Sequence, residues 1–286
     1  VYRGVGKGIE DTCKILMPAL FLLLAILIIR AVTLPGALAG INFYLNPDFS
    51  KVTGATILAA LGQAFFSLSL GMGCMITYGS YIKSKKESLP RAAATITLLD
   101  TAAAFLAGFV IFPTVFAFGA TPSAGPGLTF ITLPKVFALM PGGQIWSALF
   151  FLLLAVAALT SAISLLEVVV AYMIDNAKWS RQNAALIIGG AILLLGIPSA
   201  LSQGAMTINI AGKSFLDFLD FISNNILLPL GGLLIALFVG WVIPEIAKKE
   251  TTAHGAFGFQ SVWIWICRVV APVAIFVIFL GGLGLF

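Results

Sequence analysis

Long apolar stretches recur along this chain and limit what it can fold into. About 20 apolar residues in a helix cross the roughly 30 Å of hydrocarbon in a bilayer, and several stretches reach that length. Only 9% of the residues are charged, whereas soluble domains carry about 25%. Backbone polar groups inside a bilayer must be paired within the protein, and the lack of period-two alternation favours helices over a barrel. The sequence therefore predicts an all-α integral membrane protein.

The ends of the apolar stretches predict seven spans within a single transmembrane domain, residues 1–286. The expected spans are about 14–34, 55–82, 91–116, 143–174, 182–201, 215–243 and 261–284. Between the third and fourth spans, the apolar segment from Gly119 to Gly143 predicts a short helical hairpin. An ordinary tethered loop is the alternative for this segment.

Lysine and arginine residues lie mainly on one side of these spans. Eleven fall on one side: Arg3, Lys7, Lys14, Lys83, Lys85, Lys86, Arg91, Lys178, Arg181, Lys248 and Lys249. Only Lys51, Lys135 and Lys213 fall on the other. Because positive residues are enriched in cytoplasmic loops, we expect a cytoplasmic N-terminal end in a cell membrane. Seven spans then place Phe286 outside, and the clusters read as an orientation signal rather than a nucleic-acid surface.

Side chains that would support an intramembrane enzyme are scarce. Cys13, Cys74 and Cys267 have neither metal-binding nor disulfide spacing, and His254 is the single histidine of the sequence. No nucleophile–base pair follows from the spacing, so we expect no enzyme. The sequence opens with Val1 and not with methionine, which predicts a fragment or a trimmed chain.

The second expected span contains a glycine pair that favours a break in the helix. Gly71 and Gly73 follow Ser67 and Ser69 in mid-span. Glycine costs a helix about 1 kcal/mol relative to alanine, and unwound backbone at membrane depth persists only where it lines a cavity or binds something. Carbonyls freed at the end of a half-helix attract cations. Close helix packing is the alternative, because small residues are common at helix interfaces.

Polar residues mark the third and fourth spans. Asp100 lies near mid-membrane, where a lone carboxylate costs at least about 2.5 kcal/mol, so it should face a cavity or a hydrogen-bonding partner. Ala157, Thr160 and Ser161 share one helix face and offer a carbonyl and two hydroxyls to a small alkali cation. Hydrogen bonding of these hydroxyls to their own helix is the alternative. Glu167 predicts a polar network near the cytoplasmic end.

The first and sixth spans have unusual beginnings. Gly8 is followed ten residues later by Pro18, which lacks a backbone donor and makes this end of the helix easy to unwind. A harmless proline near a helix start is the alternative. Asp217 and Asp220 open the sixth span. They suit capping of a helix N-terminus or, for Asp220, the acidic half of an ion-pair gate.

The order of these signals resembles the neurotransmitter:sodium symporter family. A Gly-x9-Pro helix precedes PhePheSerLeuSerLeuGlyMetGly at 65–73, a span centred on Asp100, LeuThrSer at 159–161 and AspPheLeuAspPhe at 217–221. The resemblance covers essentially the whole chain, which looks like family helices 5 to 11. It implies a partial leucine-transporter-like bundle with a discontinuous second span. Family helices 1 to 4 would be absent, and the chain alone would not transport.

The resemblance also implies roles for individual residues. Phe66, Ser67, Ser69, Met72 and Leu165 would contact the substrate. Ser67 and Asp100 would bind a first sodium ion, and Ala157, Thr160 and Ser161 a second. Asp220 would form half of the outer gate, and Gly8 and Pro18 would belong to a segment whose unwinding opens a water path from the cytoplasm.

Together these roles imply sodium-coupled symport of amino acids into the cell by alternating access. The flexible side chain of Met72 suits hydrophobic or aromatic substrates. Many family members carry asparagine where Asp100 stands and need chloride, and others carry an acid one turn later, where this chain has Ala104. Asp100 therefore implies that chloride is not required. The alternatives are a transporter of the same fold for another small organic solute, and a channel or scaffold.

Overall fold

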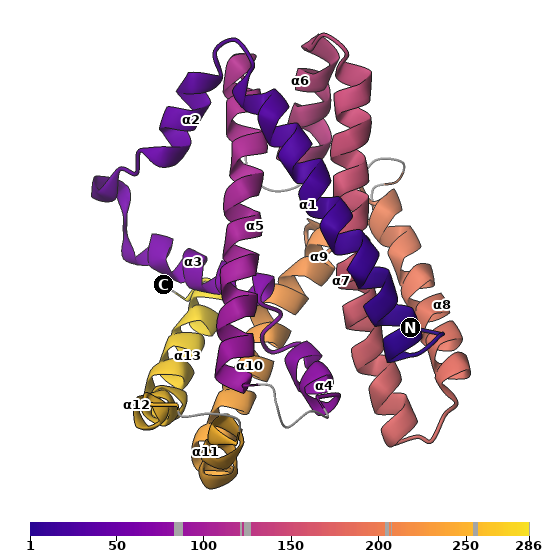
Figure 1. The fold of residues 1–286 in the computed structure, drawn as a ribbon, viewed down its shortest axis with the longest axis vertical. Coiled ribbons are helices and arrows are strands. Elements are labelled where there is room, and N and C mark those ends of the chain that lie inside the picture. The colour runs from indigo at the N-terminus through magenta and orange to yellow at the C-terminus, as the bar shows by residue number, and fades with distance from the viewer. Residues whose placement is uncertain are drawn as a thin grey trace. The chain divides into compact units, whose positions relative to one another are not determined.

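The computed structural model describes residues 1–82, 88–120, 122, 127–203, 206, 208–253 and 257–285. These residues are mostly helical (Figure 1) and form two compact units. Unit 1 contains Arg3–Lys51 and Leu98–Ile163, and unit 2 contains Val52–Thr97 and Ser164–Phe286. Helices α5 (Leu89–Ala117) and α7 (Gly143–Asp175) contribute residues to both units.

Six helices among the described residues are long and apolar enough to cross a bilayer. They are Val5–Val32, Leu89–Ala117, Gly143–Asp175, Arg181–Leu201, Phe215–Val242 and Gln260–Gly282. The second expected span is divided into α3 (Gly54–Ser67) and α4 (Cys74–Ser80). These helices confirm a helical membrane protein with about seven spans, one of them discontinuous. The first span begins earlier than expected, because a π-helical segment, η1 (Val5–Glu10), leads into α1 (Asp11–Val32).

Unit 1 is built around an apolar core. It contains η1, α1, α2 (Ala37–Leu45), η2 (Phe49–Lys51), η3 (Leu128–Thr132), α6 (Leu133–Leu139) and its portions of α5 and α7. Leu24, Val110, Leu133, Phe137 and Phe150 are buried together and come from four of these helices. In the segment expected to be a hairpin, the described residues form a helix from Leu128 to Leu139, so a second arm stays a prediction.

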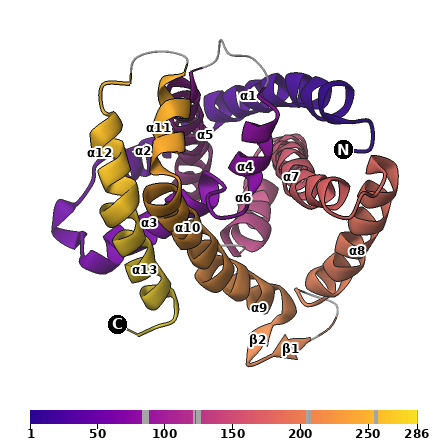
Figure 2. The same cartoon turned by 90° about the horizontal axis from the view of Figure 1, so that it is seen from below.

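Unit 2 contains the remaining helices. Besides α3 and α4, these elements are α8 (Arg181–Leu201), β1 (Asn209–Ile210), β2 (Lys213–Ser214), α9 (Phe215–Ile222), η4 (Ser223–Leu227), α10 (Leu228–Leu237), η5 (Phe238–Val242), α11 (Pro244–Thr252), α12 (Gln260–Trp265), η6 (Ile266–Val270) and α13 (Ala271–Gly282). The strands pair antiparallel, Asn209 opposite Ser214. Helix α10 packs along α13 and also contacts α3 (Figure 2).

The orientation expected from the basic residues stays a prediction. Lys83, Lys85 and Lys86, which contribute to it, lie outside the described residues, as does Phe286 at the C-terminal end. The short helix α11, which joins the last two long helices, carries Lys248 and Lys249. The orientation predicts that α11 lies on the cytoplasmic side.

The break between α3 and α4 packs directly on the backbone of α10. Gly71 has a φ of +79°, in the left-handed region that favours glycine, and a Cβ there would overlap the carbonyl oxygen of Leu228. From the other side, a Cβ on Gly231 would overlap the carbonyl oxygen of Gly71. The unwinding and the close packing that the glycine pair suggested as alternatives therefore occur together.

We predict that Gly231→Ala destabilises the protein, because the added methyl group must displace backbone that has no room to move. Overpacking of this kind costs about 1–3 kcal/mol. The matched control is Gly190→Ala in α8, where a Cβ meets nothing within 4 Å. That change should be neutral or stabilising, since alanine favours helices. Thermal unfolding in detergent compares the two, and equal melting temperatures would show that the contact is unimportant.

Candidate functional site

The centre of the candidate site is the irregular backbone between α3 and α4. Ser69, Gly71 and Gly73 have φ angles of +53°, +79° and +82°. A positive φ at a residue with a side chain, such as Ser69, is uncommon and costs of the order of 1–3 kcal/mol. Helix α3 ends at Ser67, and the N–H groups of Ser69 and Leu70 turn back to the carbonyls of Phe66 and Phe65, so regular α-helical pairing stops here. The backbone polar groups of this segment are the kind that bind ions or small polar ligands in membrane proteins.

A cleft of about 800 Å³ lies within unit 2, bordered by α3, the α9–η4 segment and α13. Residues 68–73 of the break do not line it; Ser69, Gly71 and Gly73 line a separate cavity of about 570 Å³. Phe66 and Asp220 both line it, so two residues predicted in separate roles share one cleft. Asp220 accepts a hydrogen bond from Nδ2 of Asn224 at 2.7 Å. Asn224 and Asn225 line the cleft as well, and the sequence reasoning missed them. The signal was present, because two adjacent asparagines are unusual in an apolar span.

The second half of the divided helix is tied to α7. Tyr78 of α4 donates a hydrogen bond to Oγ of Ser164 at 2.9 Å. Gly73 approaches α7 so closely that a Cβ on it would lie 3.1 Å from Cγ1 of Val168. Leu165, a predicted substrate residue, follows Ser164 and is 46% exposed. The structure therefore brings α4 next to the turn of α7 that carries Leu165.

Three polar side chains lock the end of the divided helix in place. Glu167 of α7 is completely buried, and its two carboxylate oxygens accept hydrogen bonds from Nη1 of Arg181 at 2.9 and 2.8 Å. Tyr81, directly after α4, donates to Oε1 of Glu167 at 2.6 Å. These contacts confirm the predicted network around Glu167. They join the ends of α4 and α7 to the start of α8.

The residues predicted to bind sodium are divided between the units. Thr160 donates its hydroxyl hydrogen to the carbonyl of Ala157 at 2.8 Å, so these two oxygens lie together in unit 1. This bond is the predicted alternative, in which the hydroxyl bonds to its own helix. Ser161 is exposed, and Asp100 in α5 is half-buried. Ser67 belongs to unit 2, so its pairing with Asp100 stays a prediction.

The predicted gating residues occupy helix beginnings. Gly8 is buried within η1, and Pro18 lies inside α1, where its missing N–H weakens the first turns. Both positions are helical in this structure, so their unwinding stays a prediction. Ser214 caps α9: its hydroxyl accepts from the Asp217 N–H at 3.1 Å and donates to the Asp217 carboxylate at 2.7 Å. Ser214 is therefore the cap, Asp217 supports it from the first turn of α9, and Asp220 lines the cleft.

We predict that Arg181→Ala lowers stability by about 3 kcal/mol, because it leaves the carboxylate of Glu167 buried without its counter-ion. Adding Glu167→Gln to that variant should recover part of the loss, since no buried charge is then unpaired. Lys14→Ala is the control: Lys14 pairs with Glu10 at 2.8 Å, but both side chains are more than half exposed, so no measurable change is expected. Equal melting temperatures for the two single variants would contradict this interpretation.

Comparison with known proteins gives consistent similarities. Residues 1–284 match the family described as the sodium:neurotransmitter symporter family. The chain is 41% identical over 289 residues to the uncharacterized sodium-dependent transporter YhdH of Bacillus subtilis, covering 100% of this chain and 64% of that protein. It is 43% identical over 283 residues to an uncharacterized sodium-dependent transporter of Haemophilus influenzae, covering 98% and 62%. The chain thus spans less than two thirds of these relatives.

A solved structure and a more distant relative add to this comparison. The structure is similar to the crystal structure of MhsT in complex with L-phenylalanine, with a TM-score of 0.86 and 48% sequence identity. The match covers 99% of this chain and 64% of that one. A bovine sodium- and chloride-dependent creatine transporter is 38% identical over 174 residues, covering 56% of this chain and 27% of that protein.

Proposed function

Because this chain belongs to the sodium:neurotransmitter symporter family, a family of transporters and not of enzymes, we propose that it forms part of a sodium-coupled symporter for amino acids. The observation that carries the proposal is the 48% identity, over 99% of the chain, to a protein solved with L-phenylalanine. The broken helix beside a cleft is the local feature that a substrate site requires. Transport would proceed inward by alternating access.

The proposed substrates are hydrophobic or aromatic amino acids. Phe66 lines the cleft, Met72 lies between the two glycines of the break, and Leu165 lies on the turn of α7 beside α4. These side chains offer an apolar surface, while the hydroxyl groups of Ser67 and Ser69 suit an ammonium group. The apolar side chain and the ammonium group of such an amino acid would thus each meet complementary protein groups.

Sodium coupling would follow from thermodynamic linkage. We propose a first ion at Ser67 and Asp100 and a second at Ala157, Thr160 and Ser161. An ion that binds the substrate-ready state better than other states raises substrate affinity, and substrate raises ion affinity by the same factor. The proposal for the second site rests on the residue types and on the family resemblance, because in this structure the Thr160 hydroxyl donates to the Ala157 carbonyl at 2.8 Å.

Transport would also require sequence beyond residues 1–286. The relatives and the MhsT structure are longer than the matched region, which makes up 64%, 62% and 64% of them. The gating partner of Asp220 and further sodium ligands would come from the remaining part of the protein. Reconstituting the chain with and without that part tests this point. Uptake by the chain alone would refute it.

A second candidate is a transporter of the same fold for another small organic solute. The similarity to a creatine transporter favours it, because creatine carries a guanidinium group in place of an amino group. Competition against labelled phenylalanine uptake by amino acids and by creatine separates the two. Continuous current without substrate would instead indicate a channel.

We predict that Thr160→Ala and Ser161→Ala each raise the sodium concentration for half-maximal uptake. The loss of one oxygen ligand should change it about tenfold, as for a hydrogen bond to a charged group. The assay is uptake of labelled phenylalanine into proteoliposomes by the whole protein. Ser199→Ala is the matched control, because Ser199 donates to the Leu195 carbonyl in α8 and no role is proposed for it. A sodium dependence unchanged in both Thr160 and Ser161 variants would rule out the second site.

We predict that uptake does not change when chloride is replaced by gluconate, because the carboxylate of Asp100 supplies the negative charge that offsets sodium. The variant Asp100→Asn should lose uptake in gluconate and recover part of it in chloride. The chloride-dependent creatine transporter, assayed in the same buffers, serves as a positive control. Loss of wild-type uptake without chloride would contradict the role given to Asp100.

A further inference from the structure

Two carbonyls in neighbouring helices lose their usual donors to prolines. In an α-helix the carbonyl of Gly240 would pair with the N–H of residue 244, and that of Arg268 with the N–H of residue 272. Both of these residues are proline, which has no N–H. Gly240 belongs to η5 and Arg268 to η6, two π-helical segments of the kind that often mark functional positions.

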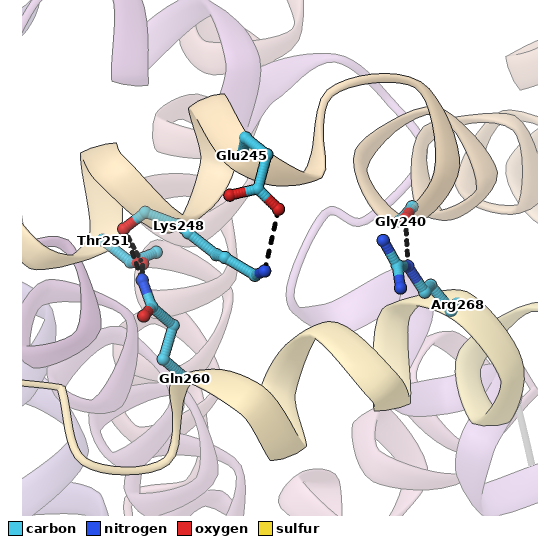
Figure 3. Close-up of polar contacts among 6 residues, drawn as sticks. All are labelled: Gly240, Glu245, Lys248, Thr251, Gln260 and Arg268. Atoms are coloured by element: carbon cyan, nitrogen blue, oxygen red, sulfur yellow. Dashed lines mark hydrogen bonds and ion pairs between the residues drawn. The ribbon is translucent and has the colours of Figure 1, made fainter.

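Each carbonyl is satisfied by a side chain from the other helix. Nε of Arg268 donates to the Gly240 carbonyl at 2.6 Å (Figure 3). In return, Nε1 of Trp241 donates to the Arg268 carbonyl at 3.1 Å. Glycine at 240 permits this approach, since a Cβ there would lie 3.0 Å from Cα of Arg268. The guanidinium is therefore held in a defined position, with its carbon 5.9 Å from the centre of the Trp241 ring.

The charge of Arg268 has no direct counter-ion in the described part of the chain. Arg268 lies eight residues into the span Gln260–Gly282, about 12 Å along the helix, where a cation requires a partner. The nearby carboxylate of Glu245 accepts from Nζ of Lys248 at 2.9 Å (Figure 3). That hydrogen bond lowers the pKa of Glu245, and the charge of Arg268 adds to the effect. Glu245 is thus paired with Lys248, and Arg268 influences it only through its charge at longer range.

The guanidinium keeps donors available for an anion. Of its five N–H groups, one is used by the Gly240 carbonyl. The four on the Nη atoms have no hydrogen-bond partner among the described residues, and these atoms are not buried. A planar fork with two free amino groups matches the oxygens of a phosphate group.

An apolar surface adjoins this cation. Leu234, Leu237, Phe238, Trp241 and Val242 line a shallow groove along α10 and η5. Trp241 borders both the groove and the guanidinium, and its side chain is 64% exposed. Tryptophan prefers the boundary between hydrocarbon and headgroups, and arginine reaches toward that boundary from within a span. Gly240, which Arg268 contacts, lies two residues from the end of the span Phe215–Val242.

We propose that Arg268 binds the phosphate of an anionic phospholipid whose acyl chains lie in the groove formed by Leu234, Leu237, Phe238, Trp241 and Val242. Basic positions between helices on the cytoplasmic side bind such headgroups, and α11 is expected on that side. The lipid phosphate supplies the direct counter-ion that Arg268 lacks among the described residues. The proposal does not depend on transport, because it concerns only the surface formed by the last two long helices.

Lipid binding to the purified whole protein in detergent tests this site. Melting temperatures are measured with added phosphatidylglycerol, phosphatidylcholine or soluble glycerol 3-phosphate, and bound lipid is counted by native mass spectrometry. We expect phosphatidylglycerol to bind and stabilise the protein more than phosphatidylcholine, and glycerol 3-phosphate to have no effect. In Arg268→Gln, phosphatidylglycerol affinity should fall about fivefold, as for loss of one basic residue near a membrane surface.

Two further variants separate a specific site from general attraction. Lys249→Gln removes a charge from α11 without touching the groove and should keep the wild-type preference. Arg268→Lys keeps the charge but not the fork and should show intermediate affinity, which provides a test if Arg268→Gln does not fold. Equal stabilisation by both lipids, equal loss in Lys249→Gln, or stabilisation by glycerol 3-phosphate would each overturn the proposal. Equal stabilisation by both lipids is the result expected if an acidic side chain from the rest of the protein neutralises Arg268.

Discussion

A helix that crosses a bilayer has to satisfy its backbone N–H and C=O groups without water, and the irregular segments of this chain meet that requirement locally. Where α3 ends, the backbone of Gly71 lies against the backbone of α10. Where prolines remove the donors for Gly240 and Arg268, side chains from the facing helix replace them. At the break itself, the N–H groups of Ser69 and Leu70 bond to carbonyls at the end of α3, so the turn satisfies part of its own backbone.

The two halves of the divided helix are held by different contacts. Helix α4 is fixed to α7 and α8 by hydrogen bonds, through Tyr78 with Ser164 and through Tyr81 with the buried Glu167. Gly71 contacts α10 through close packing, because neither Gly71 nor Gly231 has a side chain and the two backbones can touch. Helix α3 borders the cleft and presents Phe66 to it. In the proposed transporter, α3 is the half that borders the cleft, and it also packs against α10 and α13.

Much of this arrangement was predictable, because composition and spacing act locally. The length of the apolar stretches predicted the spans, and the Gly-Met-Gly motif predicted the break. The carboxylate of Glu167 in an apolar helix predicted a polar network. Partners distant in sequence were not predictable: nothing near Gly71 points to Gly231, and nothing near Glu167 singles out Arg181 over another arginine. The short α2, the two-residue strands and the π-helical segments have no distinct signal in the apolar pattern of the sequence. The sodium roles rest on family resemblance.

The proline at 272 has a consequence for how this part of the chain tolerates change. Any other residue there would bring its own N–H and return an internal donor to the carbonyl of Arg268. The indole of Trp241 would then be redundant at that carbonyl, and its N–H would turn to water or lipid. Trp241 and Pro272 thus form an interdependent pair, although some thirty positions separate them. The Trp241 N–H is needed at the Arg268 carbonyl only while residue 272 is a proline.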